Sequence, residues 1–468
     1  MKHDSPGRAT KIVLIGAGSA VFTKGLVADL IAAPELGPWE LGLVDIDPEA
    51  LEVAEGLAQR MVRATGEHGA DVEIAVSASV DRRDLLPGAD VVVTTIGVGG
   101  RRAWEADVFI PRTYGIYQPV GDTVMPGGIS RAMRMVPALV AIARDVAELC
   151  PGAWFFNYSN PMTVNCWAVR EATGVPVIGL CHGTFDVSRE LARFVGAPPE
   201  EVTTRFAGLN HLTFIHDLRR HGRDMWPVAR ERLGSYVGRL AEPTTVGSAT
   251  RPTWADNPFS WSLFSAYGAY PAANDRHVTE FFPERFPGGS YYGKTLGVDA
   301  FSFEGTIAGG DREYSHMREQ ALGRAPLDEW IFKHSVGEHE QLLHIIRAMR
   351  YDTRELFAVN LPNGGAVPNL PPDAVLELPA VATAVGLLPV RTPDLSDELA
   401  GIITRRLASV RLTLRAALTG DRTAWVEALL LDGAVTDRAT AEALVEEMAA
   451  AQRPYLPHLS LDDQSDTR

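Results

Sequence analysis

A short glycine-containing segment near the N-terminus has the residue types that bind a nucleotide. Residues 16–19 read Gly-Ala-Gly-Ser, between an apolar run that predicts a strand and a segment that predicts a helix. Glycine at Gly16 and Gly18 would let a pyrophosphate approach the backbone amides at the helix N-terminus, beside Ser19. Asp45 ends the next predicted strand, where its carboxylate can bind the ribose hydroxyls of NAD and disfavours the 2′-phosphorylated form. Val21 replaces the usual third glycine, so the alternative is an ordinary tight turn, but the order of strand, loop, helix and acid favours a nucleotide.

Four further clusters of polar residues follow predicted strands or lie in loops. They are residues 118–123 (Gln-Pro-Val-Gly-Asp-Thr), 157–162 (Asn-Tyr-Ser-Asn-Pro-Met), 179–183 (Gly-Leu-Cys-His-Gly) and 208–211 (Gly-Leu-Asn-His). The open edge of an α/β sheet places such segments against ligands. Taken alone, Cys181 is more often a small buried apolar residue, and His211 a core or surface group.

The elements that must position these residues alternate between strands and helices up to about residue 195. Strands are predicted at residues 11–15, 41–46, 72–76, 91–96, 154–158 and 175–180, with helices between several of them, as at 50–65 and 132–149. Strands that alternate with helices form right-handed crossovers and a parallel sheet. The sequence therefore predicts an α/β fold whose residues 1–200 form a Rossmann-type, doubly wound parallel sheet that binds NAD.

The pattern changes after about residue 200. Strands at 213–218, 356–360 and 374–378 suggest a second sheet, and strongly helical patterns cover 395–418 and 436–451. Residues 225–286, rich in aromatic residues and proline, read as irregular. We therefore expect an α+β domain over residues 201–468 that binds substrate and metal and, through its wide apolar helix stripes, forms subunit contacts.

The composition excludes several kinds of partner. The 468 residues are 46% hydrophobic and 22% charged, as in ordinary folded proteins. A net charge of −15 would repel phosphate backbones, so we expect no nucleic acid partner. The chain has no run of about 20 uncharged apolar residues, so we expect no membrane partner. Three cysteines are too few for a disulfide framework and predict a reducing, cytoplasmic location.

Together and in this order, the motifs resemble the NAD-dependent glycoside hydrolases of family 4. The similarity covers nearly the whole chain and includes the first loop, the Asn-Pro pair at 160–161, the Cys-His-Gly and Asn-His segments, and residues 359–363 (Val-Asn-Leu-Pro-Asn). The resemblance implies a fold like that of lactate and malate dehydrogenases, bound NAD, and a divalent metal, usually Mn²⁺, held by Cys181 and His211. A thiolate and an imidazole would give two fixed ligands and leave an open site for sugar hydroxyls or water. The resemblance also implies that the protein forms a homodimer or homotetramer.

The resemblance further implies a redox-neutral reaction on a sugar. Hydride passes from C3 to NAD, a base removes the C2 proton, the C1 group is eliminated, water adds and the hydride returns. Asp122 is the candidate acid for the departing oxygen, with a loop-stabilising Asx-turn as the alternative. Asp275 is the candidate base, in the neighbourhood where the family places an Asp or a Tyr. Tyr270 and Tyr267 are alternatives.

The residues near Cys181 favour a substrate without a 6-phosphate. In the family, Cys-His segments accompany free sugars or uronic acids, and this chain reads Cys-His-Gly-Thr at 181–184. Arg276 with its neighbouring histidine could hold a C6 carboxylate, unless Arg276 pairs with Glu280 one helical turn away. The predicted substrate-binding residues are Asn160, His182, Arg276 and His277.

We therefore expect an α-galacturonidase or α-glucuronidase that acts on a small carbohydrate. An α-glucosidase or α-galactosidase of the same family is the first alternative. A 2-hydroxy acid dehydrogenase with net oxidation is the second, and it would not need Cys181 together with His211. A non-catalytic nucleotide sensor is the third, and it predicts a degraded set of acids and metal ligands.

Overall fold

One 13-stranded sheet runs through the protein. The computed structural model describes residues 8–65, 72–181, 183–240, 257–332 and 340–456. Six parallel strands lie in the order β3-β2-β1-β4-β5-β6. They are β1 (Thr10–Ile15), β2 (Trp39–Val44), β3 (Ile74–Ser79), β4 (Val91–Thr94), β5 (Trp154–Asn157) and β6 (Val177–Leu180). This order confirms the predicted Rossmann-type, doubly wound parallel sheet.

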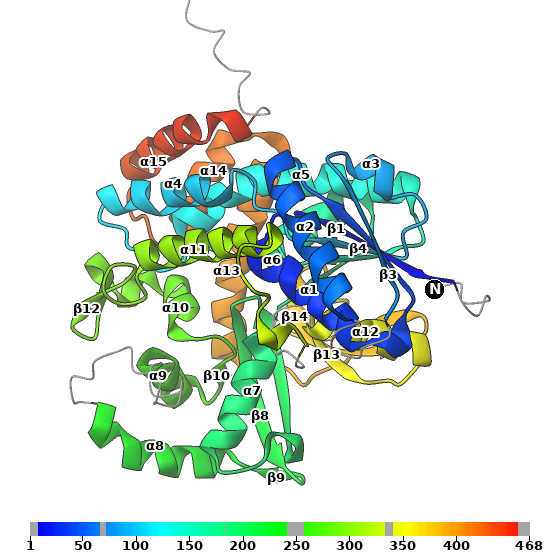
Figure 1. Cartoon of the computed structure of the whole chain (residues 1–468). Coiled ribbons are helices and arrows are strands. Elements are labelled where there is room, and N and C mark those ends of the chain that lie inside the picture. Colours follow the sequence, from blue (N-terminus) through cyan, green and yellow to red (C-terminus); the bar gives the residue numbers. More distant parts are fainter. Residues whose placement is uncertain (1–7, 66–71, 182, 241–256, 333–339, 457–468) are drawn as a thin grey trace, which may run out of the picture.

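Helices cover both faces of the parallel strands (Figure 1). In β1, Ile12 and Leu14 belong to one apolar core, while Val13 and Ile15 belong to another. Successive side chains of a strand point to opposite faces, so a wholly apolar strand needs cover on both. The first core includes α1 (Ala20–Ala32), α2 (Pro48–Thr65) and α12 (Glu340–Tyr351), and the second includes α5 (Met125–Leu149) and α6 (Met162–Thr173).

The strands of the second half extend the same sheet, so the predicted second sheet is wrong. β13 (Leu356–Pro362) pairs antiparallel with β6, where Val359 opposes Leu180 and Asn360 opposes Gly179. The other strands follow as β14 (Val375–Thr383), β7 (Val202–Leu209), β8 (Leu212–Arg220) and β10 (Tyr270–Pro271), in that order. The backbone groups on the outer side of β6 need partners, and β13 supplies them.

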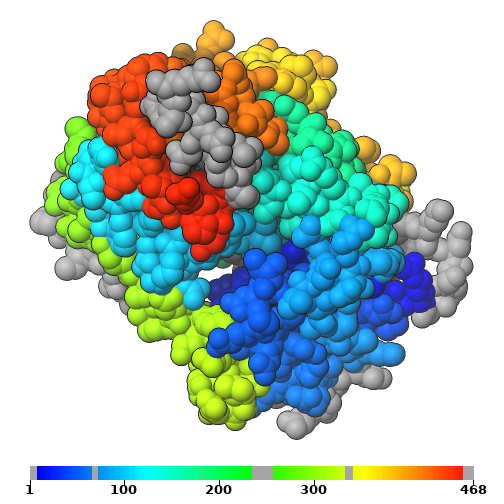
Figure 2. Space-filling model, turned by 90° about the horizontal axis from the view of Figure 1, so that it is seen from above, coloured from blue at the N-terminus to red at the C-terminus, as the bar shows by residue number. Residues whose placement is uncertain are grey.

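The C-terminal helices pack against the nucleotide half of the chain. They are α13 (Asp397–Thr419), α14 (Arg422–Asp432) and α15 (Arg438–Ala451). α13 contacts α5 and α6, and α15 contacts α4 (Gly100–Thr113). Figure 2 shows the C-terminal helices lying directly on the cyan segment that holds α4. Their apolar stripes, from which subunit contacts were predicted, thus cover neighbours within this chain.

The aromatic middle portion holds regular elements that the sequence pattern did not indicate. These are α8 (Trp226–Leu240), α9 (Pro258–Tyr267), α10 (Asp275–Val278), the 3-10 turn η5 (Thr279–Phe281) and, further on, α11 (Phe303–Ala321). Trp226, Trp261 and Phe264 pack with one another and with α7 (Gly183–Phe194) in a separate apolar cluster. Among the described helices, none is long and apolar enough to cross a membrane.

Candidate active site

The glycine-containing turn between β1 and α1 approaches the loop after β4 closely. Gly16 has φ +95°, and a Cβ there would lie 2.8 Å from the carbonyl carbon of Thr95. Ser19 caps α1, because its Oγ accepts a hydrogen bond from the amide of Phe22 at 3.4 Å. The turn thus leads into the N-terminus of α1, whose positive helix dipole fits the phosphates of a nucleotide.

Asp45 reaches this turn from the end of β2. Its Oδ2 accepts the Gly18 amide at 2.8 Å, and a Cβ on Gly18 would lie 2.9 Å from the same oxygen. The predicted acid is therefore beside the predicted loop. Val21, at the place of the usual third glycine, is 59% exposed, so nothing at that position requires a glycine. Figure 2 shows the molecule hollowed between the blue N-terminal segment, the cyan α4 segment and the yellow-green α11 segment.

Asp122, His211 and His277 form a cluster that can hold a metal ion. One ligand atom from each lies within 4.8 Å of the other two. The two imidazole rings are 4.1 Å apart between centroids. Thr123 joins the cluster, since its Oγ1 donates to Asp122 Oδ1 at 2.6 Å and lies 3.0 Å from His211 Nδ1. Two imidazoles and a carboxylate suit a divalent transition metal, so the residues present fit such an ion.

Only one of the two predicted metal ligands lies in this cluster. His211 is in the cluster, but Cys181, which follows β6 and is partly buried, is not a member of this group of three. Its role as a ligand stays a prediction. His277, predicted to bind substrate, stands instead among the candidate metal ligands. His182 lies outside the described residues.

A buried carboxylate connects the two segments that carry the predicted ligands. Glu377 on β14 is 2% exposed. It accepts hydrogen bonds from Thr184 at 2.8 Å, Thr213 at 3.0 Å and Asn210 at 3.4 Å. Thr184 follows the Cys-His-Gly segment and Asn210 precedes His211. Glu377 therefore fixes both segments relative to β14, as residues behind metal ligands commonly do.

Contacts join the nucleotide turn to the cluster along the carboxyl ends of the strands. A Cβ on Gly16 would lie 2.9 Å from the Ile96 amide, and the Ile96 carbonyl accepts from Ser159 Oγ at 2.8 Å. The next residue, Asn160, donates from Nδ2 to Asp122 Oδ2 at 2.9 Å. Its Oδ1 is buried without a hydrogen-bond partner. An unpaired buried acceptor of this kind is suited to a ligand hydroxyl.

The charges around Asp122 favour its ionised form. Burial alone would raise the pKa of the carboxyl, but the positive charges of His211, His277 and Arg131 together lower that pKa below its usual value. An ionised carboxylate suits a metal ligand. A general acid has to carry a proton, so the predicted acid role of Asp122 stays a prediction.

Asp275 has a structural environment that disfavours the predicted role of base. It is 0% exposed and accepts hydrogen bonds from the Phe259 amide at 2.7 Å, the Ser260 amide at 2.8 Å and Tyr291 OH at 2.7 Å. These bonds hold the N-terminus of α9 against α10. Of the alternatives, Tyr270 is 4% exposed within the aromatic cluster.

Arg276 is held by α11. Its Nη2 donates to Thr306 Oγ1 at 2.8 Å, while its buried Nε has no hydrogen-bond partner. Within the part of the chain that the structure describes, no ion pair links Arg276 to Glu280. The Glu280 carboxyl group instead accepts hydrogen bonds from the backbone amides of Val120 and Gly121, each at 2.8 Å. Arg276 thus keeps a donor for another acceptor.

Sequence reasoning missed three residues that shape this site: Thr123, Glu280 and Glu377. Thr123 is adjacent to a predicted residue and was part of a recognised cluster. Glu280 was considered only as a partner of Arg276. Glu377 lies in an apolar strand, and a charged residue in such a run is itself a signal, because buried carboxylates are rare unless they are paired.

Comparisons with known proteins agree with this geometry. Residues 11–197 match a profile described as family 4 glycosyl hydrolase, and residues 206–435 match the C-terminal domain of the same family. An α-glucosidase of Erwinia rhapontici is 30% identical over 96% of this chain and its own full length. An α-galacturonidase of Thermoanaerobacterium saccharolyticum is 31% identical over 95% of this chain and 96% of its own.

A solved structure has the same fold. The 6-phospho-α-glucosidase from gut microorganisms, in complex with NAD and Mn²⁺, superposes with a TM-score of 0.80 over 97% of this chain and 100% of its own, at 18% identity. The two profiles together span most of the sequence, and the relatives match from end to end. The chain therefore belongs to family 4 of the glycosyl hydrolases.

Proposed function

We propose that this glycosidase depends on NAD and a divalent metal, with Mn²⁺ the first choice, and acts on α-linked uronic acids without a 6-phosphate. The observation that carries the proposal is the contact path from Gly16 through Ile96 and Ser159 to Asn160 and Asp122. It joins a turn suited to a nucleotide and a cluster suited to a metal at one edge of the sheet. A single sugar could therefore meet both groups.

Particular residues would hold the two cofactors. The N-terminus of α1, which follows the turn at Gly16 and Gly18, would hold the pyrophosphate through its helix dipole, and Asp45 would bind the ribose. His211, His277 and Asp122, with Cys181 as the predicted further ligand, would bind the metal. When bound, NAD would supply hydride transfer and the metal would polarise the sugar oxygens. Asn160 Oδ1 would accept a hydrogen bond from a sugar hydroxyl, because it is buried without a partner.

Asp122 has two possible tasks. As an acid it would deliver a proton to the departing C1 oxygen, and as a ligand it would use the same carboxylate on the metal. Its lowered pKa favours the ligand. Asp122→Asn separates the two: a rate loss that grows with the basicity of the leaving group indicates the acid, and weaker Mn²⁺ binding in calorimetry indicates the ligand.

The free Nε of Arg276 supports a carboxylate on the substrate. Guanidinium donors match carboxylates in geometry and charge, and Nη2 of the same guanidinium group is held by Thr306. Relatives with α-galacturonidase activity in Bacillus subtilis and Thermoanaerobacterium saccharolyticum are 30% and 31% identical. The α-glucosidase of Erwinia rhapontici is 30% identical to this chain, and an α-galactosidase of Rhizobium meliloti is 31% identical. Neutral sugars are therefore the second candidate.

A substrate panel tests the proposal. Aryl α-galacturonide, α-glucuronide, α-galactoside and α-glucoside would be assayed with and without NAD and MnCl₂, following both aryl release and NADH. We expect release from a uronide only with both additions and no accumulation of NADH. Release from neutral glycosides alone would favour the second candidate. NADH formed in proportion to product would refute the redox-neutral reaction.

The order of bond changes has its own test. If the C2 proton is removed before the C1 bond breaks, product made in heavy water should carry deuterium at C2. Asp275, Tyr270 and Tyr267 remain the proposed bases, and Tyr267→Phe and Asp275→Asn would be compared for rate and for C2 exchange. Product without deuterium at C2 would contradict the proposed chemistry whatever the substrate.

A further inference from the structure

The backbone of residues 118–123 is held in place from the protein interior. Trp104 donates from Nε1 to the Val120 carbonyl at 2.7 Å. Gln118, 0% exposed, donates to the Asp107 carbonyl at 3.1 Å and accepts the Gly127 amide at 2.9 Å. These bonds hold Gln118 and the Val120 carbonyl, but none of them binds the backbone amides of Val120 and Gly121.

Glu280 supplies the contact at that point. One oxygen of its carboxyl group, Oε1, accepts the amides of both Val120 and Gly121 at 2.8 Å. Gly121 has φ +63°, and a Cβ there would lie 2.6 Å from Val108 Cγ2, so the chain turns tightly around the glutamate. Asp122 is the next residue, and its side chain leaves the turn toward His211 and His277.

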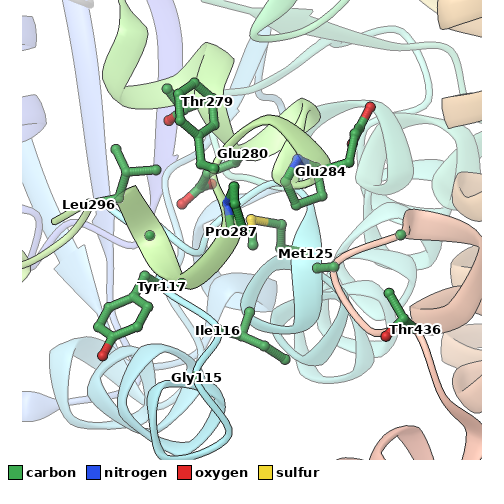
Figure 3. Close-up of a pocket in the computed structure, with 16 residues that line it drawn as sticks. Gly115, Ile116, Tyr117, Met125, Thr279, Glu280, Glu284, Pro287, Leu296 and Thr436 are labelled. Carbon is green, nitrogen blue, oxygen red and sulfur yellow. The ribbon is translucent and has the colours of Figure 1, made fainter. Parts of the chain in front are cut away.

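A pocket lies on the other side of this contact. It has a volume of about 230 Å³, and its lining includes Tyr117, Met125, Glu280 and Leu296. Figure 3 shows the Glu280 carboxyl group between Leu296 and Pro287, at the edge of the pocket. Glu280 is nevertheless only 2% exposed. It therefore separates this pocket from the Asp122 turn.

The geometry points to Glu280 as a positioning residue for the glycosidase reaction: by binding two consecutive amides, it sets the direction in which Asp122 presents its carboxylate. This inference rests on the proposed role of Asp122 at the metal and the sugar. Without the acceptor, the turn loses both bonds and the carboxylate can move. Misplacement of a reacting group by about 1 Å can reduce a rate about 100-fold.

Two variants of Glu280 separate its hydrogen bonding from its bulk. Glu280→Gln keeps an oxygen at the same distance from the backbone, whereas Glu280→Met has a similar length without an acceptor. Glu284→Gln is the control, because Glu284 lines the same pocket but its side chain is 43% exposed. We expect Glu280→Met to lower kcat about 100-fold with KM changed less than threefold. Glu280→Gln should restore kcat to within about fivefold of wild type.

Hydrogen exchange tests the inference without relying on activity. The Val120 and Gly121 amides should be protected in wild type and in Glu280→Gln, and should exchange at least tenfold faster in Glu280→Met. NAD affinity, measured by calorimetry, should be the same in all three proteins because the nucleotide turn is separate.

The results distinguish this inference from the proposed function. A wild-type protein that cleaves no glycoside would refute the function, while the exchange result would still decide whether Glu280 holds the turn. Wild-type kcat in Glu280→Met, or unchanged protection of the two amides, would overturn the positioning role. Equal loss of activity in Met and Gln variants would overturn it as well, because the Gln acceptor is intact.

Discussion

The buried carboxyl group of Glu280 should make the stability of the protein depend on pH. Burial, and next the negative charge of Asp122, raise the pKa of Glu280 to about 8 from an ordinary value of 4.5. In the window between these values the folded protein holds a proton that the unfolded chain releases. The stabilisation is thus complete below about pH 4.5 and is lost as pH rises through about 8.

The size of the effect follows from linkage. Inside this window the loss is roughly 1.4 kcal/mol for each pH unit, or about 3 kcal/mol between pH 5 and pH 7. For 468 residues the unfolding entropy is on the order of 1 kcal/mol/K. A loss of about 3 kcal/mol therefore lowers Tm by about 3 °C.

The assay compares wild type with Glu280→Gln by calorimetry at one scan rate and one ionic strength. The amide cannot ionise, and other titrating groups cancel in the difference between the two proteins. We expect the Tm of wild type relative to the variant to fall by about 3 °C from pH 5 to pH 7. Glu284→Gln controls for the loss of an exposed carboxylate nearby. A Tm difference that stays constant with pH, or that grows in favour of wild type, would refute the raised pKa.

Three further perturbations have definite expected outcomes. Gly121→Ala combines positive φ with a Cβ contact of 2.6 Å and should lower the free energy of unfolding by about 2–4 kcal/mol. The control Gly88→Ala has φ +76° but open space around the new Cβ, and should lower it by only about 1–2 kcal/mol. Equal losses for the two variants in urea titrations would show that the Cβ contact at Gly121 costs nothing. Glu377→Leu removes the hydrogen bonds of three side chains near His211 and should weaken Mn²⁺ binding 10- to 100-fold in calorimetry. Unchanged affinity would show that the segments around Thr184 and His211 keep their positions without Glu377. Arg134→Met leaves the Asp107 carboxylate, which is 0% exposed, without its ion-pair partner, and should lower the free energy of unfolding by about 3–5 kcal/mol in urea titrations. The double variant Arg134→Met with Asp107→Leu should recover most of this lost free energy.

The local parts of the fold and site were predictable because their signals lie close together in sequence. Gly16, Gly18 and Asp45 meet as expected, since a strand, a turn and a helix N-terminus are local patterns and the neighbouring parallel strand is next in the chain. The parallel sheet follows from strands that alternate with helices, whereas the order of its strands is known from the structure alone. Strand ends shifted by two or three residues, as in β3, because apolar patterns mark strand cores better than their ends.

The remaining features depend on contacts between distant segments. Pairing of β13 with β6 joins residues about 180 positions apart, and an apolar strand carries no mark that selects its partner. The proximity of His277 to His211 needs β10 beside β8, which no local pattern specifies. Asp275 was chosen from its neighbourhood, but its burial depends on α9, which lies in a segment without clear periodicity.

The join between β6 and β13 has a consequence for how the chain can be divided. Backbone pairing passes from the nucleotide strands to those that carry Glu377 and His211 without a gap. A fragment that ends near residue 200 would leave β6 as an edge strand with unpaired backbone groups, and such an edge promotes aggregation. The two halves matched by separate family profiles should therefore melt as one cooperative unit. New specificities would then be engineered by exchanging loops along the sheet and not by recombining halves.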